Sequence, residues 1–169
     1  MCMIRGCSQW TRYFYKRPCS SFYSVEKVVI SLGGSVVNPG TLNVQFLRAF
    51  CAVVRRHAKK KQIVVVTGGG TTAREYMAAV EDKGSYAQSI LGIECTQLHA
   101  LLVSYFFGKR EQVPRTMGEL RKLLRTSTFI ICGGFPESLG TTSDGTAAEI
   151  AKLMGARRFI NVTNVKGLY

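Results

Sequence analysis

Short apolar runs alternate along the chain with longer segments in which apolar residues recur at helical spacing. The short runs are rich in Val, Ile and Phe, as buried strands are, and lie at 27–32, 63–67, 128–132 and 158–163. The longer segments predict helices at 42–61, 71–82, 86–107, 117–125 and 144–154. Strands that alternate with helices indicate an α/β fold, with a mostly parallel sheet and helices on both of its faces.

Three of the predicted strands end in glycines, at 33–34, 68–70 and 133–134. Because the carboxyl ends of parallel strands meet at one edge of a sheet, we expect the three glycine loops to converge on one cleft. Glycine has no Cβ, so a ligand can approach the backbone closely, and amides beside a helix N-terminus suit an anion such as phosphate. Arg74, on the first turn after the second loop, would add charged donors.

Three helix starts carry capping signals. Thr72 with Glu75, and Thr116 with Glu119, have the spacing of a capping box. In the third, Ser143 is the expected N-cap, and Asp144 lies at the positive end of the helix dipole.

Capping does not account for the two further hydroxyls before that helix, Thr141 and Thr142, or for the long loop over 133–143. Glycine amides, hydroxyls, one arginine and one carboxylate together are typical of a phosphoryl-transfer site. The common alternatives are absent from the sequence, which has neither a Gly-x4-Gly-Lys-Ser/Thr loop nor a Gly-x-Gly-x-x-Gly turn between a strand and a helix. His57 and His99 lie in helix-like contexts, and we interpret His99 as a hydrogen-bonded helix residue rather than a base.

Composition narrows the class of partner. The 169 residues suit one domain, and the net charge of +13 favours phosphate-bearing ligands. Binding to nucleic acid is not expected, because the basic residues of 55–61 fit a solvated helix end. A membrane span is not expected either, because no apolar stretch approaches the ~18 residues that a span needs. The six cysteines form no Cys-x-x-Cys pair, which favours free thiols in a reducing, cytoplasmic compartment.

Residues 1–24 differ from the rest, because they are basic and contain no acid. We interpret them as a disordered extension, a targeting segment or the product of a wrongly assigned start codon, and place the domain at 25–169.

Five motifs in order carry a resemblance to a known family. They are Ile-Ser-Leu-Gly-Gly-Ser at 30–35, Val-Thr-Gly-Gly-Gly-x-x-Ala-Arg-Glu-Tyr at 66–76, Leu-Gly-Ile-Glu-Cys-Thr at 91–96, Gly-Thr-Thr-Ser-Asp at 140–144 and Val-Thr-Asn-Val-Lys-Gly-Leu-Tyr at 162–169. Together they resemble the amino-acid-kinase family, and within it the archaeal type of uridylate kinase. The resemblance implies a three-layer α/β/α sandwich and transfer of the γ-phosphoryl group of ATP to UMP, with Mg²⁺, to give UDP in pyrimidine biosynthesis.

The resemblance also implies roles for residues. The UMP site would comprise Gly69, Gly140, Thr141, Thr142 and Ser143. The ATP site would comprise Gly34, Ser35, Gly70, Arg74, Thr163, Asn164 and Tyr169. Arg74 and Asp144 would be catalytic: the arginine would contact the phosphates being exchanged, and the carboxylate would organise cationic groups around them. By analogy with the family we expect a homo-oligomer, a hexamer, and no protein-held metal centre.

The chain departs from the family pattern at several positions. Ser31 stands where many members have a lysine, Ser89 stands where an acid helps to hold UMP, and Lys166 replaces an acid. Family members also continue well beyond the last motif, so we expect this chain to bind UMP weakly, to turn it over little and to expose the edge of its last strand.

Two alternatives stay open at this point. One is another enzyme of the family, either an isopentenyl phosphate kinase or an amino-acid kinase; the former would use a histidine at the phosphate, and we expect neither His57 nor His99 beside a glycine loop. The other is a nucleotide-binding protein without catalytic activity.

Overall fold

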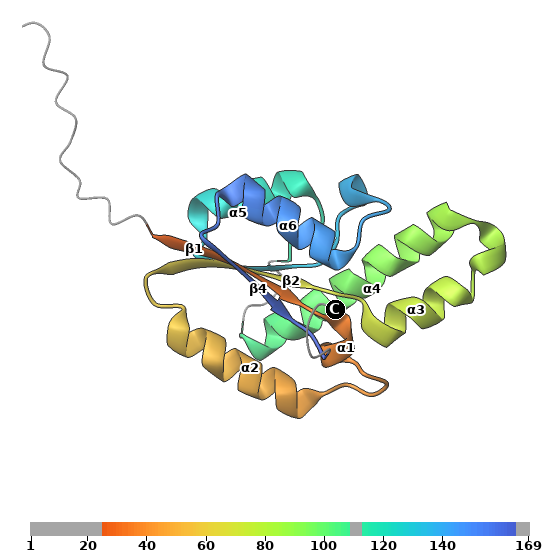
Figure 1. Cartoon of the computed structure of the whole chain (residues 1–169), viewed down its shortest axis with the longest axis horizontal. Helices are drawn as coiled ribbons and strands as arrows, with labels where there is room; N and C mark the ends of the chain where they lie inside the picture. The colour runs from red at the N-terminus through yellow and green to blue at the C-terminus, as the bar shows by residue number, and fades with distance from the viewer. Residues whose placement is uncertain (1–24, 109–112, 165–169) are drawn as a thin grey trace, which may run out of the picture.

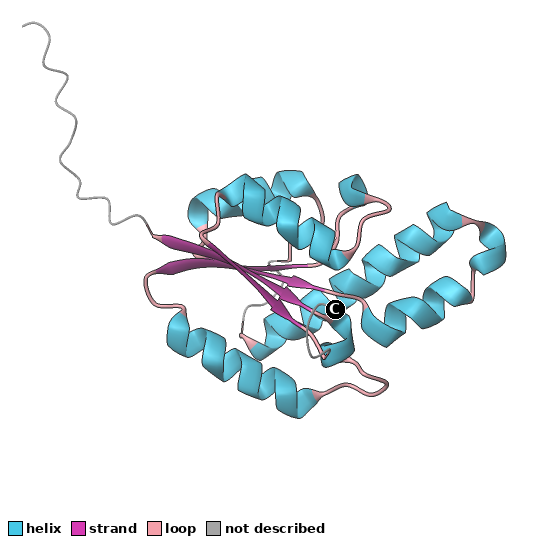
Figure 2. Cartoon of the chain, viewed as in Figure 1, coloured by secondary structure: helices cyan, strands magenta, loops and turns pink. Residues whose placement is uncertain are grey.

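A computed structural model describes residues 25–108 and 113–164. Its four strands form one parallel sheet in the order β3-β2-β1-β4 (Figure 2). They are β1 (Glu26–Leu32), β2 (Lys61–Thr67), β3 (Phe129–Cys132) and β4 (Arg158–Val162). The helices are α1 (Gly34–Val37), α2 (Val44–His57), α3 (Gly70–Ala78), α4 (Ser85–Phe106), α5 (Met117–Thr126) and α6 (Ser143–Met154), with single turns η1 (Glu81–Lys83) and η2 (Pro136–Ser138).

The helices cover both faces of the sheet, as the sequence predicts (Figure 1). One core lies between the sheet and helices α2 and α4, and includes Leu32, Leu47 and Val103. The other lies between the sheet and helices α5 and α6, and includes Leu120 and Ile150. The central strands β1 and β2 end in five buried residues each, so they are buried on both faces, as parallel strands under two helical layers must be. The three-layer α/β/α architecture is confirmed.

Several element boundaries differ from the prediction. The first long helix ends at His57 rather than at 61, because Lys60 adopts a φ of +63° and β2 begins at the next residue. The helix after the second glycine loop ends at Ala78, and the short helix α1 directly after Gly33 was not predicted. No periodic pattern marks a helix of four residues, so α1 could not be found from its sequence.

Of the three capping predictions, one is confirmed. Thr116 accepts a hydrogen bond from the Glu119 amide at 3.1 Å, while the Glu119 carboxylate accepts from the amide of Arg115, one residue before the cap. Thr72 is no cap, since α3 begins two residues earlier at Gly70, and its hydroxyl accepts from the Asn38 side chain instead.

The last described strand lies at the edge of the sheet. The residues of β4 are mostly exposed, with Phe159 44% and Ile160 43% exposed. In the described part of the chain the outer edge of β4 pairs with no other strand. This agrees with the expected exposed edge. An unpaired strand edge that carries apolar side chains favours association with other chains.

Ile160→Lys is therefore expected to reduce self-association while leaving the fold intact, because a charge on an edge strand opposes pairing with a second edge. Light scattering coupled to size-exclusion chromatography at rising protein concentration measures the effect. Leu153→Lys, on helix α6 at 42% exposure, is the matched control and should change little. Equal self-association of the wild type and Ile160→Lys would contradict the prediction.

The described cysteines are free and buried, as expected for thiols in apolar elements. Burial raises the pKa of the Cys132 thiol to about 12, and raises that of Cys51 to about 11 despite the opposing effect of Arg55. Because the thiolate is the reactive form, both side chains should resist alkylation in the native protein at pH 8 and react readily once it is unfolded. Mass spectrometry of iodoacetamide-treated peptides tests this, and rapid native labelling of Cys132 would contradict it.

Candidate active site

The glycine loops after β1 and β2 meet at the carboxyl edge of the sheet. A Cβ added to Gly34 would overlap the backbone nitrogen of Gly70, and one added to Gly68 would lie 2.7 Å from the nitrogen of Gly34. The same added atom at Gly68 would lie 3.0 Å from the Ser143 hydroxyl, which belongs to the start of α6. Three segments distant in sequence therefore converge, and only residues without a side chain fit where the first two touch.

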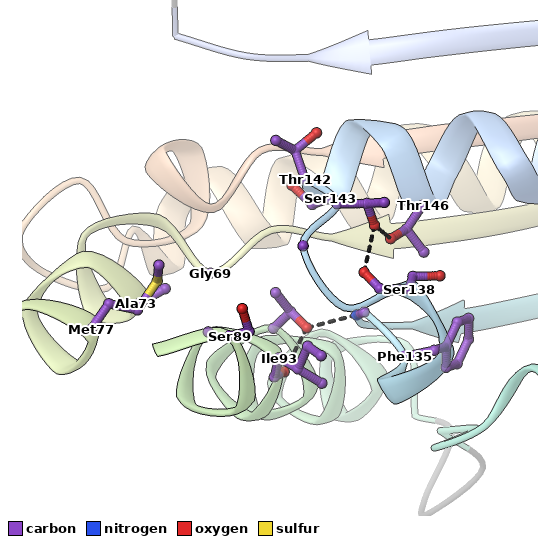
Figure 3. Close-up of a pocket in the computed structure, with 15 residues that line it drawn as sticks. Gly69, Ala73, Met77, Ser89, Ile93, Phe135, Ser138, Thr142, Ser143 and Thr146 are labelled. Atoms are coloured by element: carbon purple, nitrogen blue, oxygen red, sulfur yellow. Dashed lines mark hydrogen bonds between the residues drawn. The ribbon is translucent and has the colours of Figure 1, made fainter. Parts of the chain in front are cut away.

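A cavity of about 350 Å³ opens beside this junction (Figure 3). Its lining includes all five residues that the resemblance assigns to UMP: Gly69, Gly140, Thr141, Thr142 and Ser143. Its other lining residues are Ala73, Met77, Ser89, Gly92, Ile93, Thr96, Gly134, Phe135, Ser138 and Thr146. The N-caps of α3 and α6, Gly69 and Thr142, both line this cavity, so the positive ends of two helix dipoles lie at its wall.

The hydroxyl segment before α6 is ordered by local hydrogen bonds. Thr142, and not Ser143, is the N-cap: its side chain accepts from the Gly145 amide at 3.1 Å. Thr141 donates to the Ser138 carbonyl at 2.7 Å, which fixes the loop that leads into the helix. The prediction of Ser143 as the cap is wrong by one residue, because the helix begins at Ser143 itself. The Ser143 hydroxyl is thereby placed at the glycine junction.

Asp144, on the first turn of α6, is held by a residue of the central strand. The Ser31 hydroxyl donates to the Asp144 carboxylate at 2.6 Å. Ser31 is fully buried, so its hydroxyl needs a partner, and Asp144 supplies one while remaining exposed itself. The position at which many family members carry a lysine is thus occupied here by a neutral donor to the carboxylate.

The third glycine pair has two different roles. Gly134 lines the cavity, and its amide donates to the Thr96 hydroxyl at 2.6 Å. Gly133 instead allows helix α4 to approach, because a Cβ there would lie 2.7 Å from the Gln97 nitrogen. The Thr96 hydroxyl in turn donates to the Ile93 carbonyl, so β3 and α4 are joined at the wall of the cavity.

Residues expected on the ATP side lie together in part. Ser35 donates to the Asn164 side chain at 3.1 Å, across 129 positions of sequence. Thr163 precedes Asn164 at the end of β4 and is exposed, whereas Tyr169 lies outside the described residues. Arg74 is exposed on the first turns of α3, and its guanidinium donates to the Thr71 hydroxyl at 3.0 Å. It does not line the cavity, but its neighbour Ala73 does.

The apolar wall of the cavity was not predicted. Met77 of α3 and Ile93 of α4 line it with partly exposed side chains (Figure 3). Phe135, after β3, borders the cavity but is fully buried in the core. Only Ile93 had a signal, through its place in the Leu-Gly-Ile-Glu-Cys-Thr motif. The others could not be found from the sequence, because an apolar residue in a helix or after a strand indicates only burial in the core, not contact with a ligand.

One expectation about the histidines is wrong. His99 does lie beside a glycine loop, with its Nδ1 atom 2.8 Å from the Gly68 carbonyl oxygen. It is 2% exposed and does not line the cavity, so it contacts the loop without facing the site. The interpretation of His99 as a hydrogen-bonded helix residue agrees with this position.

Comparison with known proteins agrees with this architecture. The sequence model of the Amino acid kinase family matches residues 26–169, and the chain belongs to that family. It is 37% identical over 147 residues to the uridylate kinase of Archaeoglobus fulgidus, covering 85% of this chain and 64% of that protein. It is 33% identical over 148 residues to the uridylate kinase of Thermoplasma acidophilum, covering 85% of this chain and 63% of that protein.

The crystal structure of the Archaeoglobus fulgidus uridylate kinase superimposes with a TM-score of 0.71 at 34% identity, covering 85% of this chain and 66% of that one. The chain thus spans a little under two thirds of the length of the relatives it matches. Among the residues that the structure describes, none of the helices is both long and apolar enough to cross a membrane.

Proposed function

We propose that the protein binds UMP in the cavity and acts as a UMP kinase, transferring the γ-phosphoryl group of ATP to UMP in pyrimidine nucleotide biosynthesis. The observation that carries the proposal is that Gly69 and all of 140–143, assigned to UMP by resemblance, line one cavity at the glycine junction. The names of the related uridylate kinases support the choice of acceptor.

The cavity has the chemistry that a nucleoside monophosphate requires. The amides and hydroxyls of 140–143, with the N-termini of α3 and α6, suit the phosphate group. The apolar side chains of Met77 and Ile93 suit the flat faces of a base. A volume of about 350 Å³ is within the range of small-molecule sites.

ATP would bind on the other side of the glycine junction, against Gly34, Ser35 and Gly70, with Asn164 beside Ser35. Mg²⁺ is typically held by one or two carboxylates together with the phosphates of the nucleotide. Asp144 offers one exposed carboxylate at the junction, and within 25–108 and 113–164 no group of three ligating side chains forms a protein cage. This donor set fits a cation that arrives with ATP, where its charge would neutralise the phosphates.

Catalysis would then depend on positioning and charge, as in other phosphoryl transfers. Arg74 would donate charged hydrogen bonds to the phosphates being exchanged, once it leaves its contact with Thr71. Asp144, held by Ser31, would orient the cationic groups around the transferred phosphoryl group. The glycine junction would let donor and acceptor phosphates approach each other without side chains between them.

Binding of candidate acceptors tests the proposal. We expect UMP to raise the melting temperature of the protein, and to do so more than CMP, isopentenyl phosphate or glutamate at equal concentration, because a bound ligand stabilises by mass action. A coupled assay for UDP then measures turnover with ATP and Mg²⁺. Stabilisation by isopentenyl phosphate or glutamate in preference to UMP would contradict the choice of acceptor. Since slow turnover is expected, the assay uses a high protein concentration and a long incubation, and UMP binding with no UDP formed even then would favour a nucleotide-binding protein without catalytic activity.

A further inference from the structure

His99 contacts the second glycine loop from a buried position that does not line the cavity. It projects from helix α4, which lies against α3 (Figure 1), and it is 2% exposed. Its Nδ1 atom lies 2.8 Å from the Gly68 carbonyl oxygen, and its Nε2 atom lies 3.5 Å from the Thr72 hydroxyl. A buried imidazole with both nitrogens beside polar groups has defined directions of hydrogen bonding.

The directions of these hydrogen bonds follow from the partners. The Gly68 carbonyl can only accept, so Nδ1 carries the proton and donates. In the neutral ring Nε2 then accepts, and the Thr72 hydroxyl is the donor that faces it.

The next link has the same direction. The Asn38 amide nitrogen donates to the Thr72 hydroxyl at 2.8 Å, while its amide oxygen accepts from the Gly40 amide at 3.1 Å. Every donor in this series thus faces an acceptor. The series begins at Asn38, which follows the first glycine loop, and ends at the Gly68 carbonyl of the second glycine loop. The two loops are joined by a series of hydrogen bonds that has one consistent direction, through Asn38, Thr72 and His99, none of which lines the cavity.

The last hydrogen bond of the series is made by a peptide within the second glycine loop. The peptide between Gly68 and Gly69 has a glycine on each side, so no Cβ opposes its reorientation. In a planar trans peptide the carbonyl and the amide point in opposite directions. While the Gly68 carbonyl points at the His99 ring, the Gly69 amide therefore points away from that ring, and Gly69 lines the cavity.

We propose that His99 is a positioning residue, which holds the Gly68 carbonyl through Nδ1–H and thereby fixes the direction of the Gly69 amide at the phosphate end of the cavity. Its effect on ligand affinity rests on the proposed function, because it assumes that UMP is the anion bound there. Its effect on the loop does not depend on any ligand.

Three variants and one control test the proposal. His99→Phe fills the same space without a donor, and His99→Asn keeps an amide N–H near the position of Nδ1. Thr72→Val removes the donor to Nε2 from a side chain that is only partly buried, and so provides a milder change. Val103→Ala is the matched control: Val103 is fully buried one turn further along α4 and belongs to the core, away from the loop.

The first measurement uses no ligand. We expect ¹⁵N relaxation dispersion of His99→Phe to show microsecond-to-millisecond exchange at the Gly69 and Gly70 amides, absent from the wild type and from Val103→Ala. His99→Asn should restore the wild-type behaviour, and Thr72→Val should show a smaller effect in the same direction. If the chemical shifts and relaxation dispersion of these glycine amides are unchanged in His99→Phe, the proposal is overturned. If His99→Phe does not fold, Thr72→Val decides: unchanged chemical shifts and dispersion in that variant would equally overturn the proposal.

The second measurement is the affinity for UMP by calorimetry. We expect His99→Phe to weaken it about 10-fold, the effect of losing one buried hydrogen bond, with His99→Asn close to the wild type and Val103→Ala unchanged. A wild type that binds no UMP would refute the proposed function, while the dispersion measurement would still decide the role of His99. Wild-type affinity in a folded His99→Phe variant would overturn the role in binding.

Discussion

Gly34→Ala is expected to abolish UMP binding and to lower the free energy of unfolding by about 3 kcal/mol, the upper part of the range for overpacking. The added methyl group would overlap the backbone of Gly70 and crowd the carbonyl carbon of Gly68, so both glycine loops would have to separate. Backbone cannot move aside as the end of a flexible side chain can. The substitution would therefore distort the two loops, which weakens UMP binding, and would also lower the free energy of unfolding.

Chemical denaturation and calorimetry with UMP measure the two effects of Gly34→Ala. Gly118→Ala is the matched control, since Gly118 lies in helix α5 and its added Cβ would have only the Thr116 hydroxyl nearby, at 3.8 Å. That substitution should be neutral, or stabilising by up to about 1 kcal/mol, because alanine favours helix over glycine. Gly34→Ala protein that binds UMP like the wild type would show that the junction does not form the site.

Arg74→Ala is expected to lower kcat/KM for UMP at least ~10-fold, because a charged hydrogen bond to phosphate contributes roughly 1.5–3 kcal/mol. Arg74 is exposed and its described partner is the neighbouring Thr71 hydroxyl, so its removal should change the free energy of unfolding little. Where turnover is slow, the dissociation constant for UMP replaces kcat/KM as the readout. The change should thus appear in function and not in stability.

Arg121→Ala provides the control for Arg74→Ala. Arg121 is an exposed arginine of helix α5, which packs on the opposite side of the molecule from α3. It should leave both kcat/KM and the affinity for UMP at the wild-type value. Unchanged kinetics in Arg74→Ala would remove this arginine from the site.

Features that depend on neighbours in sequence could be predicted. The strands and long helices follow from the period of their apolar residues, and the glycine loops follow from Gly-Gly pairs at strand ends. That the loops would converge also followed, because parallel strands place their carboxyl ends at one edge.

Features that depend on tertiary packing could not be predicted. The hydrogen bond from Ser31 to Asp144 joins residues 113 positions apart, and no local pattern of either residue indicates the other. The contact of His99 with Gly68 likewise requires α4 to lie beside the second glycine loop. The cap at Thr142 was missed by one residue, because three successive hydroxyls offer equivalent local signals.

Several assignments made from the sequence stay predictions, because the described structure does not test them. These include the assignment of 1–24 as an extension, the hexameric assembly expected by analogy, and the contact of Tyr169 with ATP, which lies outside the described residues. The described residues include more of the proposed UMP site than of the proposed ATP site. On the ATP side the described residues end with Thr163 and Asn164.

A crystal structure with UMP tests the central claim most directly. We expect density for the nucleotide in the cavity, with its phosphate within hydrogen-bonding distance of the Thr142 to Ser143 segment and the Gly69 amide. Well-ordered UMP at another surface, with that cavity filled only by water at saturating ligand, would contradict it.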